Sequence, residues 1–82
     1  MKLQVLNGIK YYSNNQDLLH REDGPAIIWP SGRKDWFVNG KRHREDGPAI
    51  ECSYGHKEYF CLGIQIDYLK YIFSRMTNGN RL

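Results

Sequence analysis

A histidine, an arginine and two carboxylic acids stand together twice in this chain, at residues 20–23 and again at residues 43–46. A histidine beside a carboxylate can perform general acid–base catalysis. Both blocks read His-Arg-Glu-Asp, and they lie 23 residues apart. An active site occurs once in a chain as a rule, whereas residues that recur with a fixed period serve the repeat. We therefore expect no catalytic residues in these blocks and predict that the protein is not an enzyme.

The histidines and cysteines lack the spacing of a metal or disulfide site. Zinc ligands must converge on one ion, but His20 and His43 would lie about 10 Å apart on stacked hairpins. About 13 Å of strand would separate Cys61 from the residue opposite Cys52, so free thiols are expected. Cys52 and His56 flank one predicted turn, which leaves a weak thiol enzyme as an alternative hypothesis. We predict no metal ion and no cofactor.

The repeat extends well beyond these blocks. Residues 20–27 and 43–50 are identical, residues 32–37 align with 55–60, and residues 8–13 fit the same template with one residue inserted before His20. A period of this length predicts stacked supersecondary units. We expect a single domain over residues 1–82, with units at about 3–19, 20–42 and 43–66.

Each unit has the pattern of a β-hairpin. Residues 25–29 and 34–38 are rich in β-branched and aromatic types and are separated by turn residues, and Asn39-Gly40 is a tight-turn signal. The same pattern predicts strands at 48–52 and 57–62, and a first hairpin from residues 3–6 and 9–12. The expected fold is mainly β, an antiparallel meander of three hairpins. In each Asp-Gly-Pro turn, the glycine is expected to supply a positive φ.

The third unit ends differently from the others. Leu69, Ile72, Phe73 and Met76 have the i, i+3, i+4, i+7 spacing of an amphipathic helix. Repeat proteins need an atypical terminal unit to cover their last apolar face. We therefore predict a capping α-helix over about residues 66–77, with a partner-docking helix as the alternative.

Composition narrows the functional classes. The 82 residues have a mass of 9.7 kDa, 40% hydrophobic and 26% charged residues, a net charge of +3 and a pI near 9.0. These values indicate one small globular domain and permit an acidic partner. No apolar stretch is long enough to span a membrane, and the first residues do not resemble a signal peptide. The expectation is a cytoplasmic protein without a membrane partner.

The Gly-x-Lys-x-aromatic pattern and the Asn-Gly-Lys-Arg-His-Arg-Glu-Asp-Gly-Pro-Ala-Ile segment resemble β-hairpin repeats of the MORN type over about residues 7–66. In particular, they are similar to a variant in small repeat proteins encoded by bacteriophages. The resemblance implies a hairpin scaffold that binds proteins or lipid head groups. A phage origin would imply action inside an infected cell, such as inhibition of a host defence protein.

The leading hypothesis is a non-enzymatic interaction protein, and the alternative is a binder of nucleic acid or of a nucleotide signal. The repeated loops, a basic run and an aromatic row supply side chains for either ligand. An unpaired strand edge also favours self-association into a homo-oligomer. The expected partner is a host protein. The residues expected to contact it are Arg21, Asp23, Lys41, Arg42, Arg44, Asp46, Tyr12, Trp36 and Tyr59.

Overall fold

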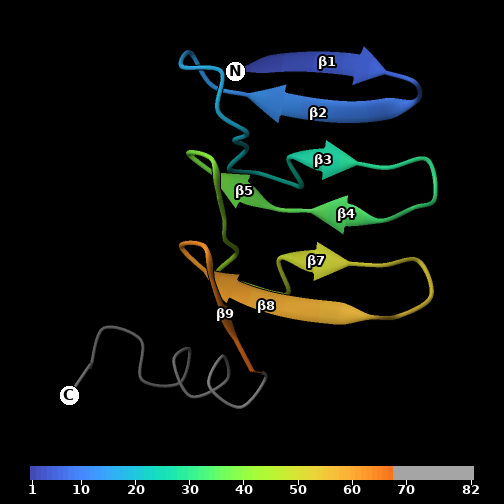
Figure 1. Ribbon diagram of the computed structural model, residues 1–82, viewed down its shortest axis with the longest axis vertical. Coiled ribbons are helices and arrows are strands. Elements are labelled where there is room, and N and C mark those ends of the chain that lie inside the picture. Colours follow the sequence, from blue (N-terminus) through green and yellow to red (C-terminus); the bar gives the residue numbers. More distant parts are fainter. Residues whose placement is uncertain (68–82) are drawn as a thin grey trace.

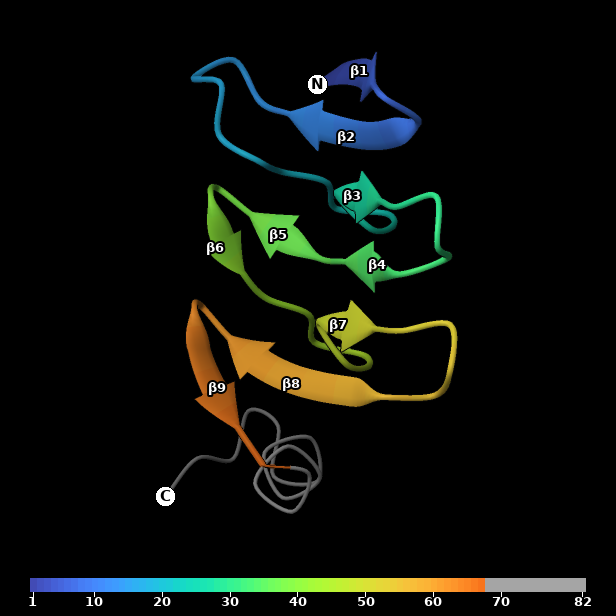
Figure 2. The same cartoon turned by 45° about the vertical axis from the view of Figure 1, so that its right-hand side comes forward.

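The computed structural model describes residues 1–67, which contain β-strands and no helix. The strands are β1 (Lys2–Leu6), β2 (Ile9–Ser13), β3 (Ile27–Ile28), β4 (Lys34–Asp35), β5 (Phe37–Val38), β6 (Lys41–Arg42), β7 (Ile50–Glu51), β8 (Lys57–Cys61) and β9 (Ile64–Ile66). One antiparallel sheet runs in the order β1-β2-β3-β4-β7-β8-β9 (Figure 1), and β5 pairs with β6 (Figure 2). The predicted mainly β, meander-like fold is therefore confirmed.

The predicted capping helix over about 66–77 lies outside the described residues, except for its first two positions. Of these, Ile66 belongs to strand β9. Within residues 1–67 there is no helix long and apolar enough to cross a membrane.

Two return strands were not expected from the sequence. Lys41 and Arg42, the start of the basic run Lys41-Arg42-His43-Arg44, form β6, and Ile64–Ile66 form the equivalent β9. Figure 2 shows that both return strands follow a turn at the same end of the sheet. The expected strand over 34–38 is also divided in two at Trp36. Its N–H bonds to the carbonyl of Ala49 in the main sheet, and its own carbonyl accepts a bond from His43.

Three tight turns join paired strands: β1 to β2, β5 to β6, and β8 to β9. Asn7-Gly8, Asn39-Gly40 and Leu62-Gly63 each have two consecutive residues with positive φ. This is the type I′ geometry, whose twist matches that of the flanking strands. The Asn-Gly turns were predicted, whereas a leucine in the left-handed region is unfavourable. The repeated geometry thus overrides the residue preference at Leu62.

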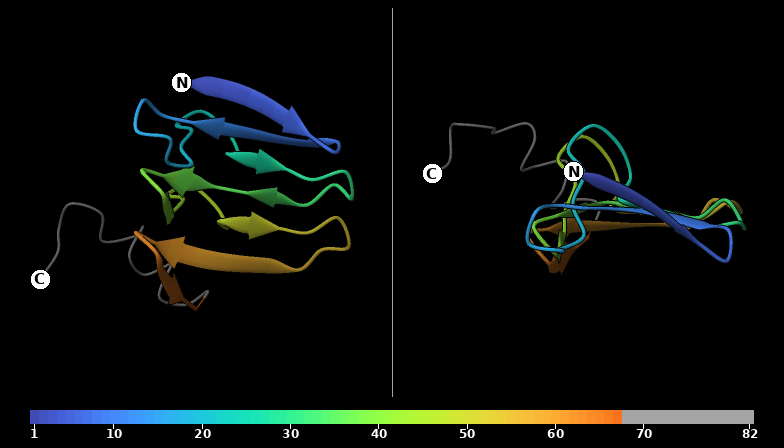
Figure 3. Two further views of the ribbon diagram at one scale, coloured as in Figure 1. Left: turned by 45° about the horizontal axis from the view of Figure 1, so that its top comes forward. Right: turned by 90° about the horizontal axis from the view of Figure 1, so that it is seen from above.

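The sheet is a single layer with very little apolar interior. Figure 3 shows the strands from above as one thin layer. Among the described residues, the buried hydrophobic side chains are Ala26, Ala49 and Ile50, and the two alanines have no exposed surface. The backbone N–H groups of Tyr12 and Trp36 donate to the carbonyls of these alanines at 2.8 Å. Polar interactions must therefore do much of the work of a core.

We expect Leu62→Asn to stabilise the protein by about 0.5–1 kcal/mol, because asparagine tolerates a positive φ better than leucine. Leu62 has a φ of 50° and is 57% exposed, so little apolar burial is lost. The midpoint of urea unfolding should rise, with an unchanged slope. Asn39→Leu, which makes the opposite exchange at the equivalent turn, should lower it. A lower midpoint for Leu62→Asn would contradict this account.

Candidate interaction surface

Three lysines form a row across one face of the sheet. Strand register places Lys10 opposite Ile28, Ile28 opposite Lys34, Lys34 opposite Glu51, and Glu51 opposite Lys57. Directly opposite residues in antiparallel strands point to the same face. All three lysines are exposed, and each lies two strands from the next, at a spacing of about 10 Å. We call Lys10, Lys34 and Lys57 the lysine row.

The predicted aromatic row lies on the same face as the lysine row. Tyr12, Trp36 and Tyr59 each follow a lysine of the row by two positions, and alternate residues of a strand share a face. Arginines stack on two of these rings. The guanidinium carbon of Arg21 is 4.1 Å from the ring centre of Tyr12, and that of Arg44 is 3.9 Å from the ring centre of Trp36. At these distances the contacts are cation–π interactions.

Each stacked arginine is also held by its own loop. Arg21 donates through Nε to Asp23 at 3.1 Å and through Nη1 to the carbonyl of Pro25 at 3.2 Å. Figure 3 shows the loops that contain residues 20–25 and 43–48 projecting on the same side of the sheet. Arginine suits this position because its planar group stacks with one side and donates along its edge. The repeated loop is therefore a clamp that fastens one unit onto the ring of the preceding one.

The second clamp has the same bonds and one more. Arg44 donates to Asp46 at 3.0 Å and to the Pro48 carbonyl at 3.1 Å, and it also reaches Glu51 at 3.3 Å. Ile28 stands at the position equivalent to Glu51 in the preceding unit, 23 residues earlier. The second clamp therefore carries an ion pair that the first one does not have.

The glycines of the clamps correct a sequence-based expectation. Gly24 and Gly47 do not have a positive φ, because a residue that precedes proline favours extended backbone. Glycine is needed there for space instead. A Cβ on Gly24 would lie 2.9 Å from the Arg21 guanidinium carbon, and one on Gly47 would lie 2.7 Å from that of Arg44. The missing side chain lets the guanidinium lie flat across the loop.

The histidines of the repeated blocks serve the tight turns. Nδ1 of His20 accepts the backbone N–H of Asn39, and Nδ1 of His43 accepts that of Leu62, both at 2.9 Å. Nδ1 is therefore unprotonated, and in the neutral ring the proton is on Nε2. Nε2 of His20 faces Glu22 at 3.5 Å, and His43 faces Glu45 in the same way. The lone pair that a general base would need is already used in a turn.

The opposite face holds a buried charge network. Asp35 is 1% exposed and is the largest fully buried side chain among the described residues. It accepts two bonds from Arg33 and one from Arg42, all at 2.9 Å, and a bond of 3.1 Å from the indole of Trp29. The hydrogen bond with Asp35 raises the pKa of Arg33 above its ordinary value. Arg42 also lies 4.6 Å from the ring centre of Phe37.

The equivalent network in the third unit contains His56, the base of the alternative thiol-enzyme hypothesis. Nε2 of His56 lies 2.7 Å from a carboxylate oxygen of Glu58, which also accepts a bond from Gln65. Cys52 and Cys61 are free cysteines, as predicted. Within residues 1–67, no group of three or more potential metal ligands converges. The contacts of His56 are thus those of a structural pair with Glu58.

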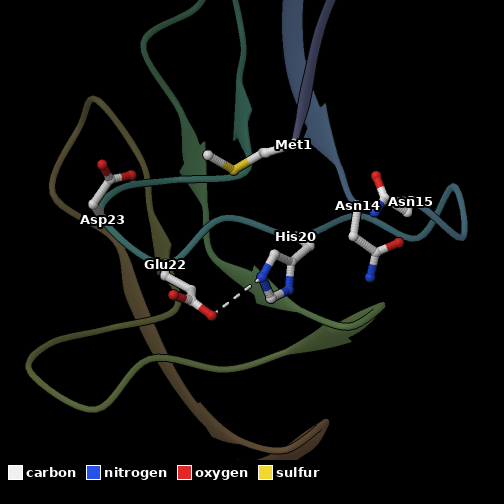
Figure 4. Close-up of a pocket in the computed structure, with 6 residues that line it drawn as sticks. All are labelled: Met1, Asn14, Asn15, His20, Glu22 and Asp23. Atoms are coloured by element: carbon white, nitrogen blue, oxygen red, sulfur yellow. Dashed lines mark ion pairs between the residues drawn. The ribbon is translucent and has the colours of Figure 1, made fainter.

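A shallow hollow of about 380 Å³ lies beside the first clamp. Figure 4 shows Met1, Asn14 and Asn15 around it on one side and His20, Glu22 and Asp23 on the other. The Glu22 and Asp23 side chains are about four-fifths exposed, at 82% and 79%. The hollow therefore has an exposed, acidic rim.

The structure places the expected contact residues in three settings. Arg21, Asp23, Arg44 and Asp46 hold the clamps on Tyr12 and Trp36, while Arg42 faces the other side and binds Asp35. Tyr59 continues the aromatic row on β8, and Lys41 is exposed in β6. Sequence reasoning missed the lysine row as a candidate site, although the repeated Gly-x-Lys pattern was its signal.

Comparison of the chain with protein-family models, curated proteins and solved structures gives no match. The function must therefore be argued from the contacts of residues 1–67. Of these contacts, the two clamps and the Asp35 network bind groups within the molecule. The lysine row presents its charges to the outside.

A double-mutant cycle tests the role of Gly47. We expect Gly47→Ala to destabilise the protein by about 1–2 kcal/mol, because the added Cβ displaces Arg44 from Trp36. In an Arg44→Ala background, the same change should cost only a few tenths of a kcal/mol. Chemical denaturation of the four proteins gives the coupling. Equal costs in both backgrounds would show that Gly47 is required for its backbone conformation instead.

Proposed function

We propose that this protein is a non-enzymatic interaction module that binds an acidic surface of a partner protein through the lysine row. The observation that carries the proposal is the distribution of cations. All four arginines of residues 1–67 form ion pairs, with partners Asp23, Asp35, Asp46 and Glu51. None of the ion pairs within that range involves the lysine row. Its charges are therefore available to carboxylates of another molecule.

The clamps support a protein partner over a nucleic acid. A single-stranded nucleic acid is held largely by bases that stack on open aromatic faces. Arg21 and Arg44 already lie on the rings of Tyr12 and Trp36. In addition, Glu51 interrupts the lysine row, which disfavours a continuous line of phosphates and suits a surface of mixed charge.

The resemblance to phage-encoded repeat proteins supports a narrower proposal, in which the partner is a host defence protein in the bacterial cytoplasm. Expression of this chain in a bacterium that carries an active defence system should then raise the number of phage plaques. A Lys10→Gln/Lys34→Gln/Lys57→Gln variant should lose most of that effect at equal protein level. If the variant raises the number of plaques as much as the parent chain does, inhibition of host defence does not depend on the lysine row.

Single substitutions decide between the lysine row and the basic run expected from the sequence. Lys34→Gln should weaken the binding of fluorescent poly-glutamate several-fold, because the central charge of the row is removed. Lys41→Gln removes an exposed charge from β6 and should have a smaller effect. Fluorescence anisotropy at low salt measures both, and the binding should weaken as salt rises.

The same titration with a single-stranded oligonucleotide tests the alternative ligand. Tighter binding of the oligonucleotide than of poly-glutamate at matched charge would favour nucleic acid over protein. A larger effect of Lys41→Gln than of Lys34→Gln would move the site to the basic run.

A further inference from the structure

Strand β1 has one open edge, although the strands equivalent to it do not. In the second and third units, β3 pairs with β2 and β4, and β7 pairs with β4 and β8. β1 pairs with β2 alone within the described residues. Figure 1 shows it as the outermost strand of the sheet. By analogy with β3 and β7, the open edge of β1 can accept one more strand.

The open edge presents the backbone groups of Leu3 and Val5. The Asn7-Gly8 turn has two residues, so Leu6 and Ile9 form a hydrogen-bonded pair next to it. Hydrogen-bonded and non-bonded pairs alternate along an antiparallel ribbon. The N–H and C=O groups of Leu6, Gln4 and Lys2 therefore point to β2, whereas those of Leu3 and Val5 point outward.

The side chains of β1 do not protect this edge. Natural edge strands are guarded by charges, prolines or bulges, but β1 has the sequence Lys-Leu-Gln-Val-Leu and a regular register. Its one charge, on Lys2, is paired with Asp17. Leu3 and Val5 remain 53% and 61% exposed on the face of the lysine row. Such an edge is a template for another strand.

We propose that a second copy of this chain covers the edge, through antiparallel pairing of the two β1 strands around Gln4. In this register, Leu3 lies opposite Val5 of the second copy, so the outward groups of both strands form about four backbone hydrogen bonds. The exposed apolar side chains meet on one face, and Lys2 lies opposite the uncharged Leu6 of the second copy. The two copies thus supply matching backbone groups and apolar side chains without bringing like charges together, which is the reason to choose a second copy as the occupant.

The pairing makes one continuous sheet and brings both lysine rows to the same face. A two-fold axis through the Gln4 pair stands perpendicular to the sheet, because opposite residues share a face. The interface consists of two short strands and is smaller than a standard protein interface. Dimerisation should therefore be concentration-dependent.

Mass measurements on the full chain test the proposal. Multi-angle light scattering should show a monomer at about 1 μM and a rising dimer fraction toward about 1 mM, as a small interface implies. Val5→Pro should leave mainly monomer at the highest concentration, because it removes an outward N–H that β2 does not use. Val5→Thr keeps that N–H and should dimerise like the parent chain.

Amide exchange of the parent chain gives a second readout that does not depend on any variant's folding. From low to high concentration, the N–H groups of Leu3 and Val5 should become at least tenfold more protected, while that of Gln4 stays protected throughout. A monomer at every concentration would overturn the proposal. So would a dimer in which Leu3 and Val5 still exchange fast. Binding of an added extended peptide at β1 by a monomeric chain would assign the edge to a partner strand instead.

Discussion

The stacking of arginine on the aromatic ring of the preceding unit is the interaction on which this fold depends. Residues 1–67 form a single layer, so without further contacts the rings of Tyr12 and Trp36 would face water. Arg21 and Arg44 cover them with flat groups whose edges bond within their own loops. Because each clamp belongs to the unit that follows the ring, it also joins neighbouring units. The same contact thus replaces part of a core and holds neighbouring units together.

On the other face, ion pairs and hydrogen bonds provide the stabilisation that apolar packing provides in larger domains. The fully buried Asp35 is stabilised by Arg33, Arg42 and the Trp29 indole. A buried carboxylate is tolerated only when it is paired and hydrogen-bonded, and loss of one partner is costly. The third unit keeps this geometry with a weaker set of groups around Glu58, which is partly exposed. The middle unit is therefore the most tightly held of the described chain.

The features that repeat along the chain could be predicted from the sequence. The features that depend on contacts between units could not. The period, the hairpins and the Asn-Gly turns follow from residue types that act locally, and the structure agrees with them. The reason for Gly24 and Gly47 did not follow, because it lies in where the Arg21 and Arg44 side chains cross the loop. Strand β6 was missed since its basic residues have no alternating pattern, and only its pairing with β5 makes it a strand.

The constant register of the hairpins spaces equivalent side chains at regular intervals along the sheet. Each unit adds two strands in the same pairing, so equivalent side chains advance by about 10 Å per unit along a straight line. The extra residue of the first unit falls before His20, in the segment between the strands, and leaves this spacing intact. Duplication or loss of one 23-residue unit would therefore change the length of the molecule in fixed steps without changing its cross-section. In such a chain, the length of the binding surface can change in evolution independently of the side chains that the surface presents.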